Sequence, residues 1–246
     1  MDALGYLALF AAGLVAGVIN VVAGGGSFLT LPILIFLGLP AGVANGTNRV
    51  GIVLQNVAAV WSFDRHGVLE RGALRWAAIP ATAGAALGTW AALEIPDEAF
   101  ERVLAFLMVA VSIYTLWRPA DDGAPAAAPP RPGWLPAAIF FTIGIYGGFV
   151  QAGVGFFLLA GTTFAGLDLV RGNAVKVLTV LAFTLLSLAL FALAGKVVWL
   201  AGLVLAAGTV AGGLVGARLT VLKGHRWVRG AVTIAILVFA TMLLVD

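Results

Sequence analysis

The 246-residue sequence contains no cysteine, which excludes disulfide bonds, thiol catalysis and a relay of cysteine-bound sulfur. It contains two histidines, His66 and His225, and each lies in a hydrophilic stretch without the neighbouring ligands that a metal site needs. A Walker sequence for nucleotide phosphates is also missing, which argues against ATP-driven transport by this chain. These absences argue against an enzyme, and we expect neither a cofactor nor a bound metal.

Charged residues are scarce. They make up 10% of the chain, whereas soluble domains contain roughly 25%. Hydrophobic residues make up 62%, and the mean hydropathy is +1.08. Several apolar runs approach or exceed the ~20 residues that span a bilayer. The composition therefore predicts an all-α polytopic membrane protein, with the lipid bilayer as one partner.

The isoelectric point near 9.7 could suggest a nucleic-acid partner. The basic residues stand in short stretches between apolar runs, however, where they act as topology signals, so we expect no nucleic acid. No Lys or Arg precedes the first apolar run, residues 3–22, and the first basic residue is Arg49. Because a signal peptide opens with basic residues, we expect this run to remain as a membrane helix.

The apolar runs predict ten helices, over residues 3–22, 27–39, 43–63, 72–93, 99–117, 135–151, 155–167, 172–194, 197–220 and 228–245. A stretch rich in Pro and Ala, 118–134, is predicted to be a linker. It divides the chain into a first transmembrane repeat, 1–117, and a second, 135–246. The segments 27–39 and 155–167 would be roughly 20 Å long, too short for a ~30 Å hydrocarbon core. We therefore expect broken or re-entrant helices.

The two halves align without gaps when one is shifted by 128 residues, which pairs Gly25 with Gly153 and Asn45 with Asn173. Matching loops have opposite charge bias. The stretches 64–75 and 218–229 are basic and are predicted to be cytoplasmic, as is the linker. The acidic stretch 94–102, the loop at Lys196 and both termini are predicted to be external. Matching loops on opposite sides are typical of inverted repeats, a common transporter architecture.

The first candidate site comprises two glycine-rich interruptions between apolar runs. They contain Gly24, Gly25, Gly26 and Ser27 in the first half, and Gln151, Gly153 and Gly155 in the second. Each precedes a short apolar segment, whose free N–H groups and helix dipole would attract an anion. The alternative is close helix packing by small residues. We favour packing for the glycines spaced by four, at positions 84, 88, 208, 212 and 216.

The second candidate site comprises polar residues that open the helices after these interruptions. They are Asn45, Thr47, Asn48 and Arg49 in the first half, and Asn173 and Lys176 in the second. A cation at membrane depth is costly unless it pairs or faces water, which favours an anion-binding role for Arg49 and Lys176. The alternative is that the Asn residues cap helices and the two cations extend toward lipid headgroups.

Two stretches that contain these residues resemble a known family. "AGLVAGVINVVAGGGSFLTLPILIFLGLPAGVANGTNRVG" and "GGFVQAGVGFFLLAGTTFAGLDLVRGNAVKVL" are similar to the paired motifs of the TauE/SafE family of sulfite and organosulfur-anion exporters. The resemblance covers essentially the whole chain. It implies two similar halves with about eight helices, fewer than the ten segments predicted above. It also implies transport of small sulfur-containing anions or related carboxylates across the cell inner (plasma) membrane.

We therefore expect a transporter that exports sulfite, thiosulfate or a sulfonate through a site between the two repeats. An anion that leaves a cell with a negative interior gains ~2.3 kcal/mol per charge per 100 mV, so the membrane potential can drive export without a coupling ion, and the direction and any coupling ion stay open. The alternatives are a transporter of a small carboxylate and a membrane assembly subunit that transports nothing. The expected partners are the anion and the bilayer, and homo-oligomerisation stays open, as does the identity of the anion.

Overall fold

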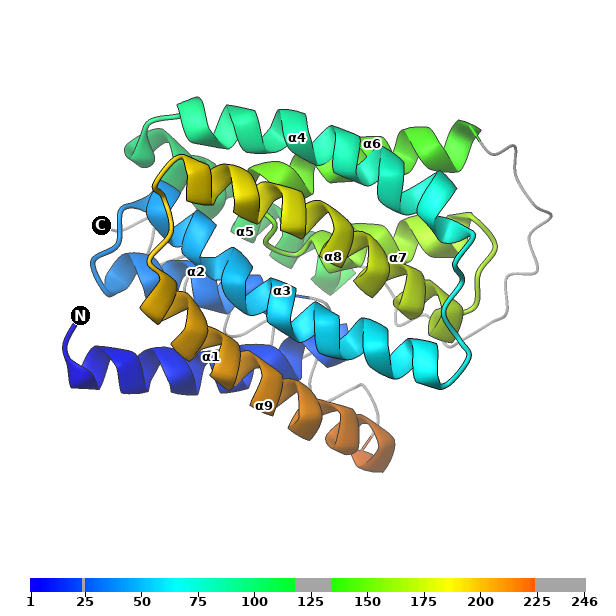
Figure 1. Cartoon of the computed structure of the whole chain (residues 1–246), viewed down its shortest axis with the longest axis horizontal. Coiled ribbons are helices and arrows are strands. Elements are labelled where there is room, and N and C mark those ends of the chain that lie inside the picture. The colour runs from blue at the N-terminus through cyan, green and yellow to red at the C-terminus, as the bar shows by residue number, and fades with distance from the viewer. Residues whose placement is uncertain (24, 118–133, 224–246) are drawn as a thin grey trace.

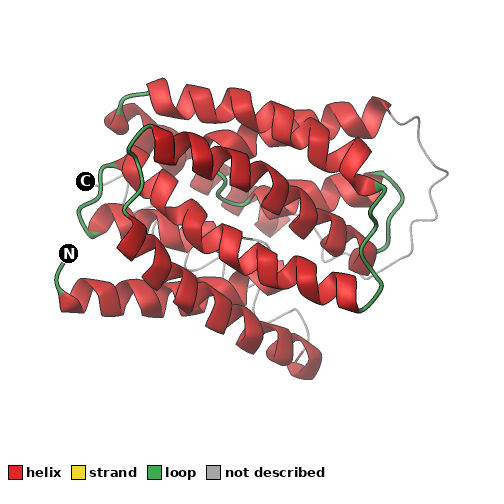
Figure 2. Cartoon of the chain, viewed as in Figure 1, coloured by secondary structure: helices red, strands yellow, loops and turns green. Residues whose placement is uncertain are grey.

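The computed structural model describes residues 1–23, 25–117 and 134–223, and every regular element in these ranges is a helix (Figure 1 and Figure 2). The elements are α1 (Ala3–Ala23), α2 (Ser27–Phe36), α3 (Ala41–Arg65), the π-helical turn η1 (Leu74–Ala78), α4 (Ile79–Glu94), α5 (Asp97–Trp117), α6 (Trp134–Phe149), α7 (Val154–Phe164), α8 (Leu169–Leu193) and α9 (Trp199–Lys223).

The prediction of an all-helical fold is confirmed, and nine of the ten predicted helices correspond to elements in the described ranges. The tenth, 228–245, and residues 118–133 of the linker lie outside the described residues. Several helices begin earlier than predicted, among them α3 and α8. Pro40 precedes α3, and Asp168 caps α8 by accepting hydrogen bonds from the N–H groups of Val170 and Arg171, both at 2.9 Å.

The most extensive helix contacts join the two halves, α1 with α9 and α4 with α6. A Cβ atom on any of four glycines would strike a backbone carbonyl of the partner helix: Gly84 on Phe141, Gly88 on Ile145, Gly208 on Phe10 and Gly212 on Leu14. The packing role predicted for these glycines is confirmed, because only glycine permits such close approach. Gly216 lies beyond the residues whose side-chain surroundings are described.

Matching loops of the two halves lie at opposite ends of the bundle (Figure 1). The turn after α3, residues 66–73, is at the right in Figure 1, and the turn after α8, residues 194–198, is at the left. The turn before α3, 37–40, is at the left, and the turn before α8, 165–168, is at the right. Inverted repeats require this placement, and the repeat relationship itself stays a hypothesis.

The outer surface has large apolar side chains on several helices. Leu4 and Phe106 expose 74% and 69% of their surface, and Trp61, Trp90 and Trp134 are also exposed. Two helical segments in the described ranges, Ala3–Asn20 and Val170–Leu193, are long and apolar enough to cross a membrane, and shorter apolar helices accompany them. Exposed tryptophans near helix ends are typical of the bilayer interface.

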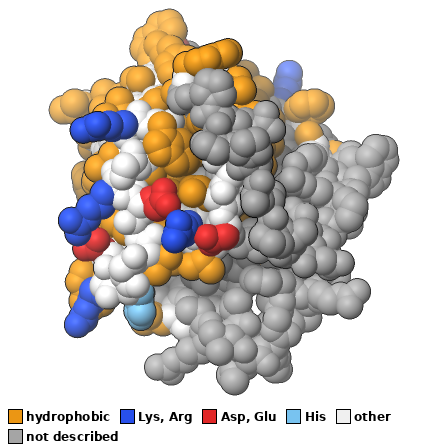
Figure 3. All heavy atoms as spheres, turned by 90° about the vertical axis from the view of Figure 1, so that its right-hand side faces the viewer, with side chains coloured by type: hydrophobic (Ala, Val, Ile, Leu, Met, Phe, Trp, Pro, Cys, Tyr) orange, Lys and Arg blue, Asp and Glu red, His pale blue; other side chains and the backbone are white. Residues whose placement is uncertain are grey.

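Charged side chains gather at one end of the bundle, which is on the right in Figure 1 and faces the viewer in Figure 3. Here Arg71 pairs with Asp64 at 3.0 Å, and Arg171 pairs with Glu70 at 3.5 Å. All four groups are solvent-exposed or half-buried, so these pairs contribute little to stability. This end includes the basic stretch 64–75 that we predict to be cytoplasmic.

Polar side chains, in contrast, are buried in the interior along α3. The buried members are Asn45, Thr47, Asn48, Arg49, Gln55 and Asn56. A helix that buries polar groups in this number must provide each with a hydrogen-bond partner or a polar cavity. The buried polar groups of α3 therefore indicate a candidate site where α3 faces the other half.

Candidate functional site

The two helical interruptions meet near the middle of the bundle. The chain breaks between α1 and α2, and again between α6 and α7, where Gln151 and Gly153 have positive φ values of 41° and 70°. A residue other than glycine rarely adopts such a φ, so Gln151 is held there by its surroundings. The starts of α2 and α7 lie close together across the two halves, since Phe28 lies against Gly153 and Phe156 lies against Gly25.

Aromatic rings from each half cover the glycine of the other half. A Cβ atom on Gly25 would lie 3.0 Å from the ring of Phe156, and one on Gly153 would overlap the ring of Phe28. The 128-residue shift also pairs Phe28 with Phe156. These contacts give Gly25 and Gly153 a packing role at the interruptions, and neither glycine lines the cavity that lies beside them.

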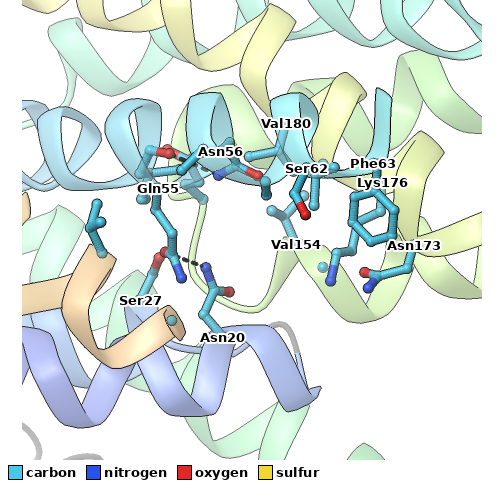
Figure 4. Close-up of a pocket in the computed structure, with 18 of the residues that line it drawn as sticks. Asn20, Ser27, Gln55, Asn56, Ser62, Phe63, Val154, Asn173, Lys176 and Val180 are labelled. Atoms are coloured by element: carbon cyan, nitrogen blue, oxygen red, sulfur yellow. Dashed lines mark hydrogen bonds between the residues drawn. The ribbon is translucent and has the colours of Figure 1, made fainter. Parts of the chain in front are cut away.

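A cavity of about 250 Å³ lies between the halves next to the interruptions (Figure 4). Its polar lining consists of Asn20, Ser27, Gln55, Asn56, Ser62, Gln151, Asn173 and Lys176, and its apolar lining includes Ile52, Phe63, Val154, Val177 and Val180. Liquid water occupies about 30 Å³ per molecule, so the cavity can hold a ligand of several non-hydrogen atoms. None of the described residues that line it is acidic.

Lys176 supplies the cation of this cavity. Only 6% of its surface is exposed, and its Nζ forms no hydrogen bond or ion pair with another described residue. Asn173, one turn earlier on α8, lies beside it at one end of the cavity (Figure 4). The Oδ1 atom of Asn173 is likewise buried without a partner. A buried ammonium without a counter-charge is costly, and an anion in the cavity would remove that cost.

Amide side chains form the opposite wall. Asn20 Nδ2 donates to Gln55 Oε1 at 2.8 Å, and Asn56 Nδ2 donates to the Ile52 carbonyl at 2.8 Å. Figure 4 shows Asn20 and Gln55 facing each other beside Ser27. Asn20, Gln55 and Asn56 each have donor or acceptor atoms beyond those used in these bonds, and all three side chains line the cavity. This wall can therefore bind polar atoms of a ligand without adding charge.

A second, smaller cavity of about 10 Å³ adjoins the first and shares Asn20, Ser27 and Gln55 with it. Thr30 Oγ1 donates to Asn48 Oδ1 at 2.6 Å, while Asn48 Nδ2 is buried without a partner. The volume suits a single water or ligand oxygen. The small cavity extends the site to the N-terminus of α2.

Arg49 does not line either cavity. It is fully buried, and its guanidinium donates to four uncharged oxygens: the Gly147 carbonyl at 3.3 Å, the Gly148 carbonyl at 2.5 Å, Gln151 Oε1 at 3.3 Å and Asn45 Oδ1 at 3.4 Å. Its Cζ atom also lies 4.9 Å from the centre of the Phe191 ring. Arg49 thus binds the C-terminal carbonyls of α6, where a cation is favoured by the helix dipole.

Two further predicted residues bind the backbone of the other half. Asn45 Nδ2 donates to the Phe149 carbonyl at 2.8 Å, and Thr47 Oγ1 accepts from the Val198 N–H at 3.0 Å. Both side chains are fully buried and lie outside the cavity lining. Asn45, Thr47 and Arg49 therefore join the two halves, whereas Asn48 bonds to Thr30 within the first half.

The predicted site residues fall into three groups. Ser27, Gln151, Gly155, Asn173 and Lys176 line the larger cavity, and Gly26, Ser27 and Asn48 line the smaller one. Gly25, Gly153, Asn45, Thr47 and Arg49 make contacts between the halves. Gly24 lies outside the described residues.

Sequence reasoning missed Asn20, Gln55, Asn56 and Ser62, which all line the larger cavity. A signal for two of them was present. Asn48, Gln55 and Ser62 are spaced by seven residues, which places them on one face of a helix. Following the polar face of α3 beyond Arg49 would therefore have found Gln55 and Ser62.

The sequence is similar to proteins already described as transporters. The family described as "Sulfite exporter TauE/SafE" matches residues 9–243. A "Probable membrane transporter protein" of Haemophilus influenzae is 31% identical over 231 residues, which cover 92% of this chain and 89% of the relative. The "Probable membrane transporter protein ORF9" of a Sinorhizobium species is 28% identical, with 97% and 92% covered. "Probable membrane transporter protein YfcA" of Escherichia coli K12 is 28% identical, with 97% and 89% covered. No solved structure matches the chain.

Proposed function

Because the chain belongs to the sulfite exporter TauE/SafE family, we propose that it exports a small sulfur-containing anion, such as sulfite, thiosulfate or a sulfonate. The proposed route is the cavity between the two halves, in a multi-pass protein of the cell inner membrane. The family and the names of its relatives favour transport over catalysis. The observation that supports an anionic substrate most strongly is the buried Lys176 ammonium, which has no partner among the described residues.

Two half-helices add to the positive character of the cavity. Ser27 and Val154 are the first residues of α2 and α7, and both line it. The helix dipole is positive at this end, and it adds to the potential in the cavity although the N–H groups of Phe28 and Phe156 already donate to the Gly25 and Gly153 carbonyls. Transporters use such half-helix N-termini near the bilayer midplane to bind anionic groups. The substrate would lie between Lys176 and these two helix ends.

The cavity extends from the half-helix ends toward the basic end of the bundle. Ser62 and Phe63, which line it, belong to the last turn of α3 beside the turn 66–73. The positive-inside rule predicts that this end is cytoplasmic, so an exported anion would enter the cavity from there. Export would then be driven by the membrane potential, at ~2.3 kcal/mol per charge per 100 mV.

A ligand screen tests the proposed substrate. The purified protein is heated with sulfite, thiosulfate, sulfonates or carboxylates at fixed ionic strength, and the melting temperature is measured. We expect stabilisation by sulfur anions in the wild type and in Arg171→Gln, a control that removes an exposed cation from the same helix. Lys176→Gln should lose this stabilisation. Stabilisation by carboxylates alone would favour the carboxylate hypothesis.

Transport is measured with protein reconstituted into liposomes that contain the stabilising anion. We expect efflux that follows the imposed membrane potential and that Lys176→Gln abolishes. Binding without efflux under any potential would contradict the transport proposal, and neither binding nor efflux would favour an assembly subunit.

The proposed orientation has its own test, because the natural chain contains no cysteine. His66→Cys and Ala194→Cys place single thiols in the turns 66–73 and 194–198, at opposite ends of the bundle. A membrane-impermeant thiol reagent added outside intact cells should label the protein with Ala194→Cys and spare the protein with His66→Cys. Labelling of both from the same side would exclude inverted repeats.

A further inference from the structure

The cavity occupies one half of the length of α3 and of α8. Its α3 residues run from Ile52 to Phe63, and its α8 residues run from Asn173 to Val180. Since the two helices run in opposite directions in Figure 1, both stretches lie toward the end with the turn 66–73. A substrate in the cavity can therefore approach from that end.

Side-chain contacts fill the other half of the same two helices. Thr89 Oγ1 of α4 donates to Ser187 Oγ of α8 at 2.7 Å and contacts the Gly148 carbonyl of α6 at 3.2 Å. The Gly148 carbonyl also accepts the 2.5 Å hydrogen bond from Arg49. Thr89, Ser187 and Arg49 are fully buried. These buried contacts lie in the halves of α3 and α8 that are nearer the turn 194–198, which the cavity lining does not include.

Arg49 is at the centre of these contacts. Its guanidinium binds two elements of the other half, the end of α6 through Gly147 and Gly148, and the interruption through Gln151. Gln151 in turn donates to Thr184 Oγ1 of α8 at 2.5 Å and lines the cavity. One side chain thus joins α3, α6 and α8 beside the half-helix ends.

The chemistry of the Arg49 contacts makes them reversible. All four acceptors of Arg49 are uncharged oxygens, and its Nε has no partner among the described residues. A buried guanidinium that contacts uncharged oxygens and the Phe191 ring, with no carboxylate among its described partners, keeps much of its desolvation cost, which hydration would remove. If this side opens to water, water molecules can therefore replace the hydrogen bonds that Arg49 loses. An apolar contact that opened to water would gain no such replacement.

On the basis of the transport function proposed above, we propose that Arg49 is a positioning residue that closes the substrate path on the side of the turn 194–198. A path open at both ends would leak, so a transporter must close one end before it opens the other. The Arg49 contacts exist in the state whose cavity extends to the turn 66–73, and they break in the opposite state. Lys176 faces the substrate, whereas Arg49 sets which end is open.

Cysteine reactivity tests this assignment in the cysteine-free chain. Ser187→Cys is a nearly isosteric reporter on the closed side, and Ser62→Cys is a reporter in the cavity wall. With Arg49 intact, a small thiol reagent should modify the Ser62→Cys protein quickly and the Ser187→Cys protein slowly. Adding Arg49→Gln should accelerate modification at position 187 at least tenfold and slow it at position 62. Arg49→Lys should produce a smaller change in the same directions, because lysine lacks the planar fork.

Opposite changes at the two reporters separate closure from simple stability. Faster modification at both positions would mean that Arg49 only stabilises the fold, and unchanged rates at both would mean that it closes nothing; either result overturns the assignment. If Arg49→Gln fails to fold, the same criteria apply to Arg49→Lys. Thiosulfate is added in a parallel series. Loss of its protection at position 62 in Lys176→Gln tests the substrate proposal, independently of the Arg49 result.

Discussion

The two halves of the chain use matching helices for different purposes. In the first half, α3 directs Asn45, Thr47 and Arg49 into hydrogen bonds with the second half, and these groups are occupied. In the second half, α8 directs Asn173 and Lys176 into the cavity, where the Lys176 ammonium and Asn173 Oδ1 have no described partner. Under the two proposals above, the first half closes one side of the path and supplies the amide wall of the cavity, and the second half supplies its cation.

The two buried cations have different surroundings although their residue types are similar. Arg49 and Lys176 are both buried cations near the start of a long helix, yet they differ in every contact. A cation bound by carbonyls is occupied, and a cation in a cavity is available to a ligand. The difference between the halves therefore predicts which substitutions damage the fold and which damage binding.

The largest effect is expected at the interruption of the second half. Gly153 has a positive φ of 70° and leaves no room for a side chain under the Phe28 ring, so Gly153→Ala adds both strain and overlap. We expect Gly153→Ala to lower the free energy of unfolding by roughly 1–3 kcal/mol through the strained backbone alone. The larger substitution Gly153→Leu should abolish transport. Gly25→Ala should be milder, because Gly25 lacks the positive φ and its Cβ would lie 3.0 Å from a ring that can shift.

Protein yield after solubilisation, melting temperature and efflux measure this prediction. Gly72→Ala is the matched control, since a Cβ there meets nothing within 4 Å. Equal tolerance of Ala at positions 25 and 153 would contradict the asymmetry between the two interruptions.

The second effect concerns the two cations. A charge-assisted hydrogen bond from Lys176 to an anion contributes about 1.5–3 kcal/mol. We therefore expect Lys176→Gln to raise the Kd for the stabilising anion by roughly 10- to 150-fold. Arg49→Gln should raise it less, because the guanidinium does not line the cavity. Isothermal titration in detergent at fixed ionic strength measures both values. If Arg49→Gln raises the Kd as much as Lys176→Gln does, or more, the guanidinium is in contact with the anion.

The third effect concerns the matched asparagines. Asn45→Ala leaves the half-buried Phe149 carbonyl without its 2.8 Å hydrogen bond, which costs about 1 kcal/mol of stability. Asn173→Ala removes a side chain whose Oδ1 has no described partner, so it should change stability less and anion affinity more. Melting temperature and Kd are compared for the two proteins. If Asn45→Ala and Asn173→Ala change the melting temperature equally and the Kd equally, the two asparagines do not have different roles.

Much of this fold could be predicted because its main elements depend on local composition. Runs of apolar residues predicted nine described helices, and the glycines at positions 84, 88, 208 and 212 predicted close packing. The site was harder to predict. The polar residues Asn45, Arg49, Asn173 and Lys176 were identified as one group, but which of them have partners depends on residues far away in the sequence. The acceptor Gly148, for example, is 99 residues from Arg49.

The smallest effect concerns the start of the two long helices. Pro40 precedes α3 and offers no side-chain hydrogen bond, whereas Asp168 caps α8, the helix of Asn173 and Lys176. The hydrogen bond from the Arg171 N–H, with a second from Val170, keeps the pKa of the Asp168 carboxyl below its ordinary value. Deprotonated Asp168 therefore stabilises the folded state, because protonation weakens both bonds.

The sign of the pH dependence follows from this lowered pKa. The stabilisation is fully present above the ordinary value, which is near 3.8, and is lost as the pH falls through the lower pKa of the folded protein. We expect Asp168→Ala to lower the melting temperature at neutral pH by less than Asn45→Ala does, because the cap is exposed. Asp168→Asn keeps a capping oxygen and does not titrate, so it should retain most of the stability at neutral pH and lose less than the wild type in acid. Melting curves between neutral pH and pH 3 measure both variants. If Asp168→Asn and the wild type lose stability equally in acid, another carboxyl group is responsible and the cap of α8 is not the acid-sensitive difference between the halves.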